Sequence, residues 1–275
     1  MARSFRNSFS KWEDGLGISV GLRTGCSVGP VNSPCDLLIV AAFAPELEGL
    51  EPLLGEGMQA DVGGLSFCAK PIGIGLISAA SGAASRVEAA KPRAVALIGT
   101  CGAYPRGGLD GSSSGGSGRS SSDRASPARR YLAMGDVVVG KSVFLVDASV
   151  AAGKAAFPEP MSTQIDPHPA LTAALSVSGA PRVNIATTLA ITTDDALAAH
   201  LGQATDTAVE HLEAFAVGTA CAALDVPYAV VLGVANIVGS KGRAQWRTGH
   251  RAAAEAAASY IARWVQAGGA GVPHR

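Results

Sequence analysis

The fold class is indicated most clearly by VEHLEAFAVGTACAALDVPYAVVLGVAN, residues 209–236. Within it, apolar side chains recur over residues 210–224 at a period near 3.6, which predicts a helix with one packed face. Residues 228–234, YAVVLGV, form a short apolar run rich in valine, which is typical of a buried strand. A helix that leads directly into a buried strand is the repeating unit of an α/β protein.

The same alternation continues on both sides of this stretch. Short apolar runs predict strands at residues 37–42, 94–99, 136–140, 182–187 and 228–234. Helical patterns occur at residues 77–90, 168–177, 210–224 and 251–265. We therefore expect an α/β protein with a central mixed, mostly parallel sheet flanked by helices, and ligands bound beyond the carboxyl ends of its strands.

Two segments depart from this alternation. Residues 1–35 are rich in Ser, Arg and Gly without a sustained period, so we expect a flexible N-terminal extension. Residues 105–130, PRGGLDGSSSGGSGRSSSDRASPARR, bury too little apolar surface to offset their ordering entropy, so we expect a disordered Gly/Ser insertion. A single domain then spans residues 36–266, followed by a C-terminal tail at 267–275.

The composition of the 275-residue chain argues against several classes of function. It has 22 basic and 22 acidic residues, and a formal net charge of zero provides no field to hold a nucleic acid. No apolar run approaches the roughly 20 residues that span a bilayer, and no apolar block near the start suits a signal peptide, so we expect no membrane partner and a cytoplasmic location. Charged residues make up only 16% of the chain, against a typical share of about 25%, which favours a homo-oligomer, a dimer or higher.

The cysteines form no recognisable pattern. There are five of them, an odd number without a CxxC pair, so we expect reduced thiols and neither a disulfide framework nor a zinc site. Motifs for other metals or for an organic cofactor are also missing from the sequence. We therefore expect a protein that works without a cofactor.

Three polar residues stand where a strand ends or a helix begins. Glu46 follows the first strand in AAFAPELE, Glu213 lies in the first turn of the predicted helix, and Asn236 follows the strand at 228–234. Between them, GTCGA at residues 99–103 ends another strand with glycines that let backbone N–H groups approach an anion or a sugar oxygen. A single glutamate at a helix start is more often a partner of the helix dipole than a catalyst, so each signal is weak by itself.

Taken together and in this order, the segments resemble the nucleoside phosphorylase and nucleosidase superfamily. The resemblance covers about residues 36–266 and is carried by AAFAPELE, GIG at 73–75, GTCGA, GDVVV at 135–139 and the stretch 209–236. It is greatest to the hydrolytic branch, which contains 5′-methylthioadenosine/S-adenosylhomocysteine nucleosidase and futalosine hydrolase. The resemblance implies the three-layer phosphorylase/hydrolase-like fold and hydrolysis of the N-ribosidic bond of a purine nucleoside by water.

The resemblance also implies roles for individual residues. Glu46 matches the glutamate that positions and deprotonates the attacking water, Glu213 matches the one that holds the ribose hydroxyls, and Asn236 takes the position that faces N7 of the base. A carboxylate at the ribose strengthens its hydrogen bonds as positive charge develops on the sugar in the transition state. The substrate-binding positions that the resemblance further implies are Gly75, Thr100, Cys101, Gly102, Leu212, Asp194 and Phe144.

Asn236 is the departure that bears on the substrate. The methylthioadenosine enzymes have an aspartate here, which can give a proton to an adenine leaving group, whereas an amide only exchanges hydrogen bonds. An amide suits a base that leaves as its anion, such as a 6-oxopurine, and NIVGSKGRAQW at residues 236–246 resembles the ending of futalosine hydrolases. We therefore expect hypoxanthine release from futalosine, in menaquinone biosynthesis. A flipped amide also pairs with adenine, so the methylthioadenosine reaction stays open.

Two further alternatives also stay open. A phosphate-dependent purine nucleoside phosphorylase needs fixed cations, but Leu97 stands where the phosphorylase branch has an arginine. Leu232 replaces another arginine that is usual in the family, and such losses fit a non-catalytic nucleoside-binding relative. Hydrolysis is favoured over phosphorolysis because the cations are missing, and an enzyme is favoured over a non-catalytic relative because the three polar positions all keep hydrogen-bonding residues.

Residues beside these motifs receive simpler interpretations. Asp194 and Asp195 are expected to cap and begin a helix, although the family's base pocket is lined from this region. His211 is expected at the surface or in an interface, because i,i+2 neighbours on a helix point to different faces. The resemblance implies that an aromatic residue of a second subunit completes the pocket, and Phe144 or Phe157 is expected to be that residue here. Trp246 either shapes the pocket rim or packs the start of the last helix.

Overall fold

The computed structural model describes residues 34–55, 57–105 and 131–274. All of the described residues belong to one compact unit. The expected N-terminal extension, apart from its last two residues, and nearly all of the expected Gly/Ser insertion lie outside the described residues. Within the described part of the chain, no helix combines the length and the apolar character that crossing a membrane requires.

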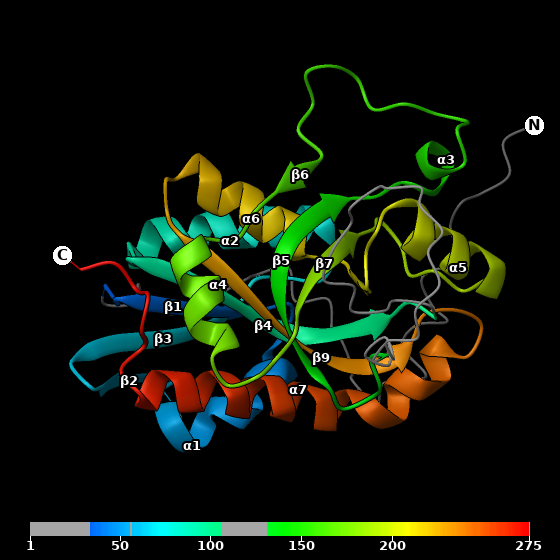
Figure 1. Ribbon diagram of the computed structural model, residues 1–275. Helices are drawn as coiled ribbons and strands as arrows, with labels where there is room; N and C mark the ends of the chain where they lie inside the picture. Colours follow the sequence, from blue (N-terminus) through cyan, green and yellow to red (C-terminus); the bar gives the residue numbers. More distant parts are fainter. Residues whose placement is uncertain (1–33, 56, 106–130, 275) are drawn as a thin grey trace, which may run out of the picture. The chain divides into compact units, whose positions relative to one another are not determined.

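The strands of the described residues form one sheet (Figure 1). They are β1 (Leu37–Ala41), β2 (Gln59–Val62), β3 (Leu65–Pro71), β4 (Ala94–Ala103), β5 (Val137–Leu145), β6 (Gln164–Ile165), β7 (Arg182–Thr187), β8 (Val209–His211) and β9 (Tyr228–Ile237). β1 is buried along its whole length, and β9 at all but its last two positions. Such continuous apolar runs form strands that are covered on both faces.

The order of strands along the sheet is β2-β3-β1-β4-β8-β7-β5-β6, and β9 pairs with both β4 and β5. β4, β8, β7, β5 and β9 therefore pair in a closed ring. β1 runs parallel to β3 and β4, β4 parallel to β9, and β7 parallel to β5 and β8. The antiparallel pairs are β2–β3, β4–β8, β5–β6 and β5–β9. The sheet is thus mixed and mostly parallel, as the sequence predicts.

Helices cover both faces of this sheet. They are the 3-10 helix η2 (Ala44–Leu50) and the α-helices α1 (Glu51–Leu54), α2 (Leu76–Ala90), α3 (Ala148–Ala151), α4 (Pro169–Ser176), α5 (Asp195–Ala204), α6 (Ala214–Ala223) and α7 (Gly242–Gln266). In Figure 1, α7 and α1 lie on one side of the central strands, and α2 and α6 lie on the other. The predicted three-layer α/β arrangement is confirmed.

Alternate side chains of the strands enter two apolar cores. On β4, Val95 and Leu97 belong to the core beneath α2 and α6, whereas Ala96 and Ile98 belong to the core beneath η2 and α7. All four are at most 2% exposed. Because β4 is packed from both sides up to this point, its carboxyl end at residues 99–103 is held rigidly where the polar residues begin.

Two of the predicted helices begin at other residues in the structure, and the strands β2, β3 and β6 have no counterpart among the predicted ones. Residues 209–211 form strand β8, and α6 begins only at Ala214, so the predicted helix start at residue 210 is wrong. β8 pairs with β4 and β7 and is buried at every position, and these long-range pairings outweigh the local helical period. α7 begins at Gly242, well before the predicted start at 251.

The cysteines also differ from expectation. Cys35 and Cys68 form a disulfide, so the expectation of reduced thiols is wrong for this pair. The two residues are 33 positions apart in the sequence, and only the parallel pairing of β1 with β3 brings them together. Cys101 and Cys221 are free thiols in the core.

The C-terminal tail packs against the domain. Arg93, at the start of β4, forms an ion pair with Asp36 at 3.1 Å and donates hydrogen bonds to the carbonyl oxygen of Pro273. Hydrogen bonds from the backbone of Ser66 and from Arg93 lower the pKa of Asp36 to about 2. Val272 is buried beside this contact, in the core beneath α7.

Candidate active site

Glu46 is a buried carboxylate at the carboxyl end of β1. It lies in the first turn of η2, which begins directly after the strand with a proline near its start. Oε1 accepts the N–H and the Oγ–H of Thr100, both at 2.9 Å, and Oε2 accepts the N–H of Ala42 at 3.2 Å. Only 4% of the residue is exposed. Three hydrogen bonds from the ends of β1 and β4 therefore fix the carboxylate in one place.

Gly99 makes this placement possible. A Cβ at Gly99 would lie 3.1 Å from each carboxylate oxygen of Glu46, which is closer than ordinary van der Waals contact. The backbone N–H of Thr100, which the sequence pattern assigned to an anion or a sugar oxygen, is used by Glu46 instead. Gly99 of GTCGA is thus needed because the carboxylate of Glu46 approaches the backbone closely.

The surroundings of Glu46 suit a carboxyl group that exchanges protons. Burial raises the pKa of Glu46 to about 7, and the charge of Glu213 adds to the rise. The hydrogen bonds from Thr100 and Ala42 oppose it. A carboxyl group with a pKa near neutrality is both able to accept a proton and present in its charged form at working pH.

Glu213 is the residue immediately before α6 and is 5% exposed. Its Oε1 accepts the N–H of Gly75 at 2.7 Å. Gly75 precedes α2 with a φ of 83°, a conformation that favours glycine and that directs its N–H to the carboxylate. Gly73, two residues before Gly75, donates its N–H to the carbonyl oxygen of Ala42, and the N–H of Ala42 binds Glu46, so the loop before α2 connects the two glutamates.

His211 is buried beside Glu213, so the expectation of a surface position is wrong. It is 4% exposed, because strand β8 carries it into the interior. Its Nδ1 accepts the N–H of Glu213 at 3.2 Å and the N–H of Ala214 at 3.1 Å. An accepting nitrogen carries no proton, and burial lowers the pKa of His211, so the hydrogen bonds assign a neutral ring protonated at Nε2. The 3.5 Å between Nδ1 and Oε2 of Glu213 is therefore a contact between two acceptors and not an ion pair.

Asn236 lies near the end of β9 and is the register partner of Gly102 on β4. A Cβ at Gly102 would lie 2.9 Å from Nδ2 of Asn236, so this glycine makes room for the amide. Thr100 and Gly102 are two positions apart on β4, which brings Glu46 and Asn236 to the same end of the sheet. Among the described residues, no side-chain hydrogen bond engages the half-buried Asn236 amide, so its donor and acceptor are both unused there.

Asp195 ties the loop after Asn236 to α5. Its carboxylate accepts the N–H of Ser240 at 2.7 Å and the Oγ–H of Ser240 at 2.9 Å, and these hydrogen bonds lower the pKa of Asp195. Asp194 is exposed and caps α5 by accepting the N–H of Leu197 at 2.7 Å. The predicted capping role of Asp194 is confirmed, and its predicted contact with substrate stays a prediction.

Trp246 contacts the same threonine that binds Glu46. Its Nε1–H donates to Oγ1 of Thr100 at 3.2 Å. The indole stacks on His250, with ring centroids 4.3 Å apart. This contact exists because α7 begins at Gly242 and carries Trp246 across the end of β4, whereas the sequence pattern began the helix after Trp246.

The other residues with predicted substrate contacts vary in exposure. Cys101 is 3% exposed, and burial raises the pKa of its thiol, which excludes the thiol as a nucleophile at neutral pH. Leu212, between β8 and α6, is half-buried. Phe144, on β5, packs against a small apolar cluster that includes Tyr104 and Val238. Phe144 is thus partly buried by residues of its own chain, including Val238 in the segment that follows Asn236.

Glu210 is a buried acidic residue that the sequence analysis did not single out. It accepts the phenolic O–H of Tyr104 at 3.1 Å, and the N–H and Oγ–H of Thr192 at 2.9 and 2.6 Å. Burial raises the pKa of Glu210. These contacts fix Thr192, two residues before Asp194, so Glu210 holds the start of α5 in place. Only its place on β8 distinguishes it, and the sequence pattern predicted a helix there.

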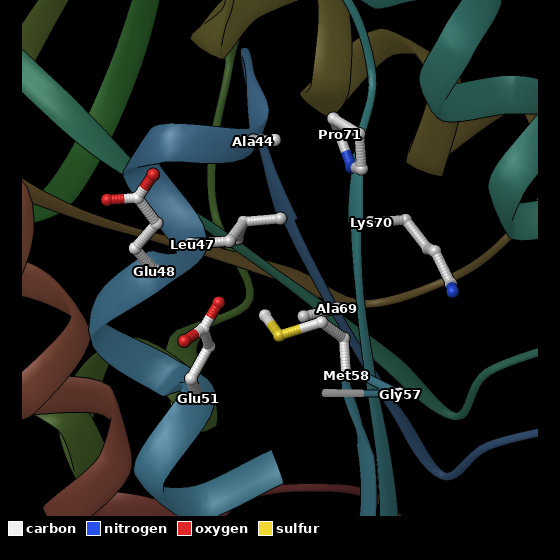
Figure 2. A pocket seen from close by; sticks show the side chains of 9 residues that line it. All are labelled: Ala44, Leu47, Glu48, Glu51, Gly57, Met58, Ala69, Lys70 and Pro71. Atoms are coloured by element: carbon white, nitrogen blue, oxygen red, sulfur yellow. The ribbon is translucent and has the colours of Figure 1, made fainter. Parts of the chain in front are cut away.

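A separate hollow of about 320 Å³ lies between η2, α1 and β3. Figure 2 shows Glu48 and Glu51 on its helical wall, Met58 between the walls, and Lys70 on β3 with its amine directed away from the two glutamates. The residues that line it are Ala44, Leu47, Glu48, Glu51, Gly57, Met58, Ala69, Lys70 and Pro71. The residues of the candidate site, Glu46, Glu213 and Asn236, are not part of this lining.

Comparisons with known proteins agree on the fold. No protein family model and no curated protein matches the sequence. Among solved structures, a 5′-methylthioadenosine/S-adenosylhomocysteine nucleosidase from Neisseria meningitidis, in complex with methylthio-immucillin-A, matches with a TM-score of 0.66 at 18% identity, over 84% of this chain and 98% of that one. An S-adenosylhomocysteine nucleosidase from Streptococcus pyogenes, in complex with 5-methylthiotubericidin, matches with a TM-score of 0.67 at 18% identity, over 85% and 97% of the two chains.

A third solved structure, a futalosine hydrolase mutant from Helicobacter pylori, matches with a TM-score of 0.67 at 14% identity, over 86% of this chain and all of that one. These likenesses extend over nearly the whole length of each solved chain. The fold that the sequence resemblance implied is therefore confirmed, and the chain has the fold of these nucleosidases.

Proposed function

We propose that this protein hydrolyses the N-ribosidic bond of a purine nucleoside. The observation that carries the proposal is the buried carboxyl of Glu46, with its pKa raised to about 7, beside the second buried glutamate, Glu213. Burying two carboxyl groups near each other opposes folding, and strongly perturbed carboxyl groups are concentrated at catalytic sites. They stand at the carboxyl ends of strands in a fold shared with nucleosidases, which is where α/β proteins bind ligands.

In the proposed reaction, Glu46 acts as the general base. Oε1 already accepts two hydrogen bonds, so the water binds at Oε2, which accepts only one. As the bond from C1′ to the base nitrogen breaks, its electron pair leaves with the base, and the water oxygen bonds to C1′ and gives a proton to Glu46. The products are a ribose with a new 1′-hydroxyl and the free base, which takes up one proton from solvent at nitrogen, while Glu46 releases to solvent the proton it received.

Glu213 is proposed to bind the ribose hydroxyls and to stabilise the positive charge that develops on the sugar. Gly75 holds one of its oxygens at 2.7 Å, and His211 fixes its backbone, so the carboxylate is oriented before the substrate arrives. Leu212 is proposed to lie beneath the ribose. The backbone of Cys101 and Gly102 is proposed to line the sugar, since the N–H of Thr100 is occupied by Glu46.

Asn236 is proposed to bind the departing base and to select a 6-oxopurine. Its amide is unused by the described residues, and it lies at the same end of β4 and β9 as the two glutamates. An amide cannot give up a proton to an adenine leaving group, so a base that leaves as its anion is favoured. The proposed substrate is therefore a hypoxanthine nucleoside, with futalosine as the first candidate and 5′-methylthioadenosine as the second.

Water rather than phosphate is proposed as the nucleophile. Leu97, at the position where phosphorylases resembling this chain have an arginine, is fully buried in the core beneath α2 and α6. A phosphate at that position would find an apolar side chain instead of a cation, and phosphate recognition relies on such charge-assisted hydrogen bonds.

A homo-oligomer is proposed as the working form. Ile74 and Ile77 lie on either side of Gly75 and are 63% and 79% exposed. Exposed apolar side chains next to a ligand site fit coverage by a second copy of the chain. Sedimentation analysis tests this proposal, and a monomer at all protein concentrations would contradict it.

The function is tested by product analysis on a panel of nucleosides. The purified protein is incubated with futalosine, 5′-methylthioadenosine, S-adenosylhomocysteine and inosine, with and without phosphate, and the free bases are separated by chromatography. Hypoxanthine from futalosine without phosphate supports the full proposal, and release of adenine alone contradicts the substrate assignment. A requirement for phosphate overturns hydrolysis, and E46Q without loss of turnover overturns the role of Glu46.

A further inference from the structure

Trp246 stands outside the pair of glutamates but reaches one of them through a single hydroxyl group. Its Nε1–H is 3.2 Å from Oγ1 of Thr100, and the same Oγ1 is 2.9 Å from Oε1 of Glu46. Trp246 comes from α7, Thr100 from β4 and Glu46 from η2, so three separate elements meet in this chain.

The direction of these hydrogen bonds follows from the chemistry of the groups. An indole N–H can only donate, so Oγ1 of Thr100 accepts from Trp246. A threonine hydroxyl has one hydrogen, and with the indole hydrogen on its oxygen it directs its own hydrogen to Oε1 of Glu46. The indole hydrogen occupies one of the two lone pairs of the threonine oxygen, so Trp246 disfavours the alternative in which the Glu46 carboxyl donates from Oε1 to that oxygen.

As a consequence, the two oxygens of the Glu46 carboxyl have different hydrogen-bond partners. Oε1 receives the N–H and the O–H of Thr100 and acts only as an acceptor. The proton of the neutral carboxyl is left to Oε2, which accepts only the N–H of Ala42. An oriented donor of this kind favours the charged form of Glu46, which is the form that a general base requires.

The stacking partner of the indole supports a fixed orientation. The ring of His250, one turn further along α7, lies at an interplanar angle of 18° to the indole, and its Nδ1 is 2.9 Å from the carbonyl oxygen of Trp246. An indole held on one face by a ring from its own helix has little freedom to turn its N–H away from Thr100.

We propose that Trp246 is a positioning residue for Glu46: its indole N–H sets the Thr100 hydroxyl as a donor to Oε1 and so directs proton transfer to Oε2. This inference rests on the proposed function, because it assigns Glu46 the work of a general base. It assigns Trp246 no contact with the substrate.

The test is the pH profile of kcat/KM for the wild type, W246F, T100V and the double variant W246F/T100V. The acid limb of this profile reports the ionisation of the base in the free enzyme. W246F removes the donor, which destabilises the charged form of Glu46, so the acid limb is expected to move upward by about half a pH unit. T100V is expected to move it further, and the double variant is expected to match T100V, because without the hydroxyl the indole has no route to Glu46.

The matched control is W264F. Trp264 lies near the other end of α7, and it donates its Nε1–H to the carbonyl oxygen of Ala270, just after the helix, at 3.2 Å. W264F loses a hydrogen bond of the same kind, although Trp264 is the more deeply buried of the two residues, and it is expected to leave the acid limb in place. An unmoved acid limb in W246F, a limb moved equally by W264F, or a shift in W246F that persists undiminished on the T100V background overturns the inference.

A second readout needs no turnover, so that failure of the proposed function and failure of this inference are distinguishable. The titration of Glu46 is read from the pH dependence of the unfolding free energy, as the difference between chains with and without E46Q. This difference is measured on the wild-type and W246F backgrounds, and its midpoint is expected to move upward in W246F. A wild type that cleaves no nucleoside overturns the proposed function, whereas a midpoint that stays in place overturns the role of Trp246.

Discussion

Replacing Glu46 by glutamine is expected to change how the stability of the protein depends on pH. The folded protein holds a proton on Glu46 up to about pH 7, whereas the carboxyl of an unfolded chain releases it near its ordinary pKa of 4.5. Between these values the folded state binds more protons than the unfolded state, so the free energy of unfolding falls as the pH rises. The contribution is absent well below pH 4.5 and fully expressed above pH 7.

The magnitude follows from the two pKa values. They differ by about 2.5 pH units, so the charged Glu46 lowers the free energy of unfolding by about 3 kcal/mol at high pH. Most of this loss falls between pH 5 and pH 8. The amide of E46Q is neutral throughout, and its less favourable hydrogen bonding to the N–H groups of Thr100 and Ala42 costs the same at both pH values.

The assay is urea denaturation followed by circular dichroism at pH 5 and pH 8. The stability of E46Q relative to the wild type is expected to rise by about 2–3 kcal/mol between the two pH values. E48Q is the matched control, because Glu48 belongs to the same helix but is exposed and hydrated in the folded chain. A relative stability of E46Q that is unchanged between pH 5 and pH 8 would refute the reasoning that burial governs the ionisation of Glu46.

Substitutions at three other residues test the rest of the site. E213Q is expected to lower kcat by about a hundredfold or more, since it removes an oriented charge from the developing cation, and a variant with full turnover would contradict that role. G99A places a methyl group 3.1 Å from both oxygens of Glu46, so we expect a tenfold or greater loss of kcat, on the order of a lost general base, and a wild-type rate would disprove the close approach. H211L leaves two buried N–H groups unpaired at the start of α6, which is expected to cost about 2 kcal/mol in urea denaturation, whereas H211N, whose Oδ1 can replace Nδ1, is expected to recover most of it. Equal stability of the two His211 variants would show that the cap is not what stabilises this turn.

The strands and helices with strong local patterns could be predicted from the sequence. Arg182–Thr187 is a strand in both the prediction and the structure, and α2 begins within one residue of its predicted start. The strand β8 could not be predicted in this way, because its three residues are held by partners on β4 and β7 that are far away in the chain. Local periodicity is informative only where local packing decides the conformation.

The candidate site likewise combines features set by local sequence with features set by long-range contacts. The α/β class, and the positions of Glu46, Glu213 and Asn236 near the ends of elements, could be predicted from the sequence, because apolar periodicity and the residues where it stops are properties of neighbouring residues. The hydrogen bonds from Thr100 to Glu46 and from Gly75 to Glu213 could be found only in the folded chain.

The tertiary structure also decided that His211 is buried and neutral, that Cys35 pairs with Cys68, and that Trp246 donates to Thr100. The physical reason is that each of these contacts joins groups from different elements, and the burial and hydrogen bonding that set their ionisation exist only after the sheet has closed and the helices have packed on it.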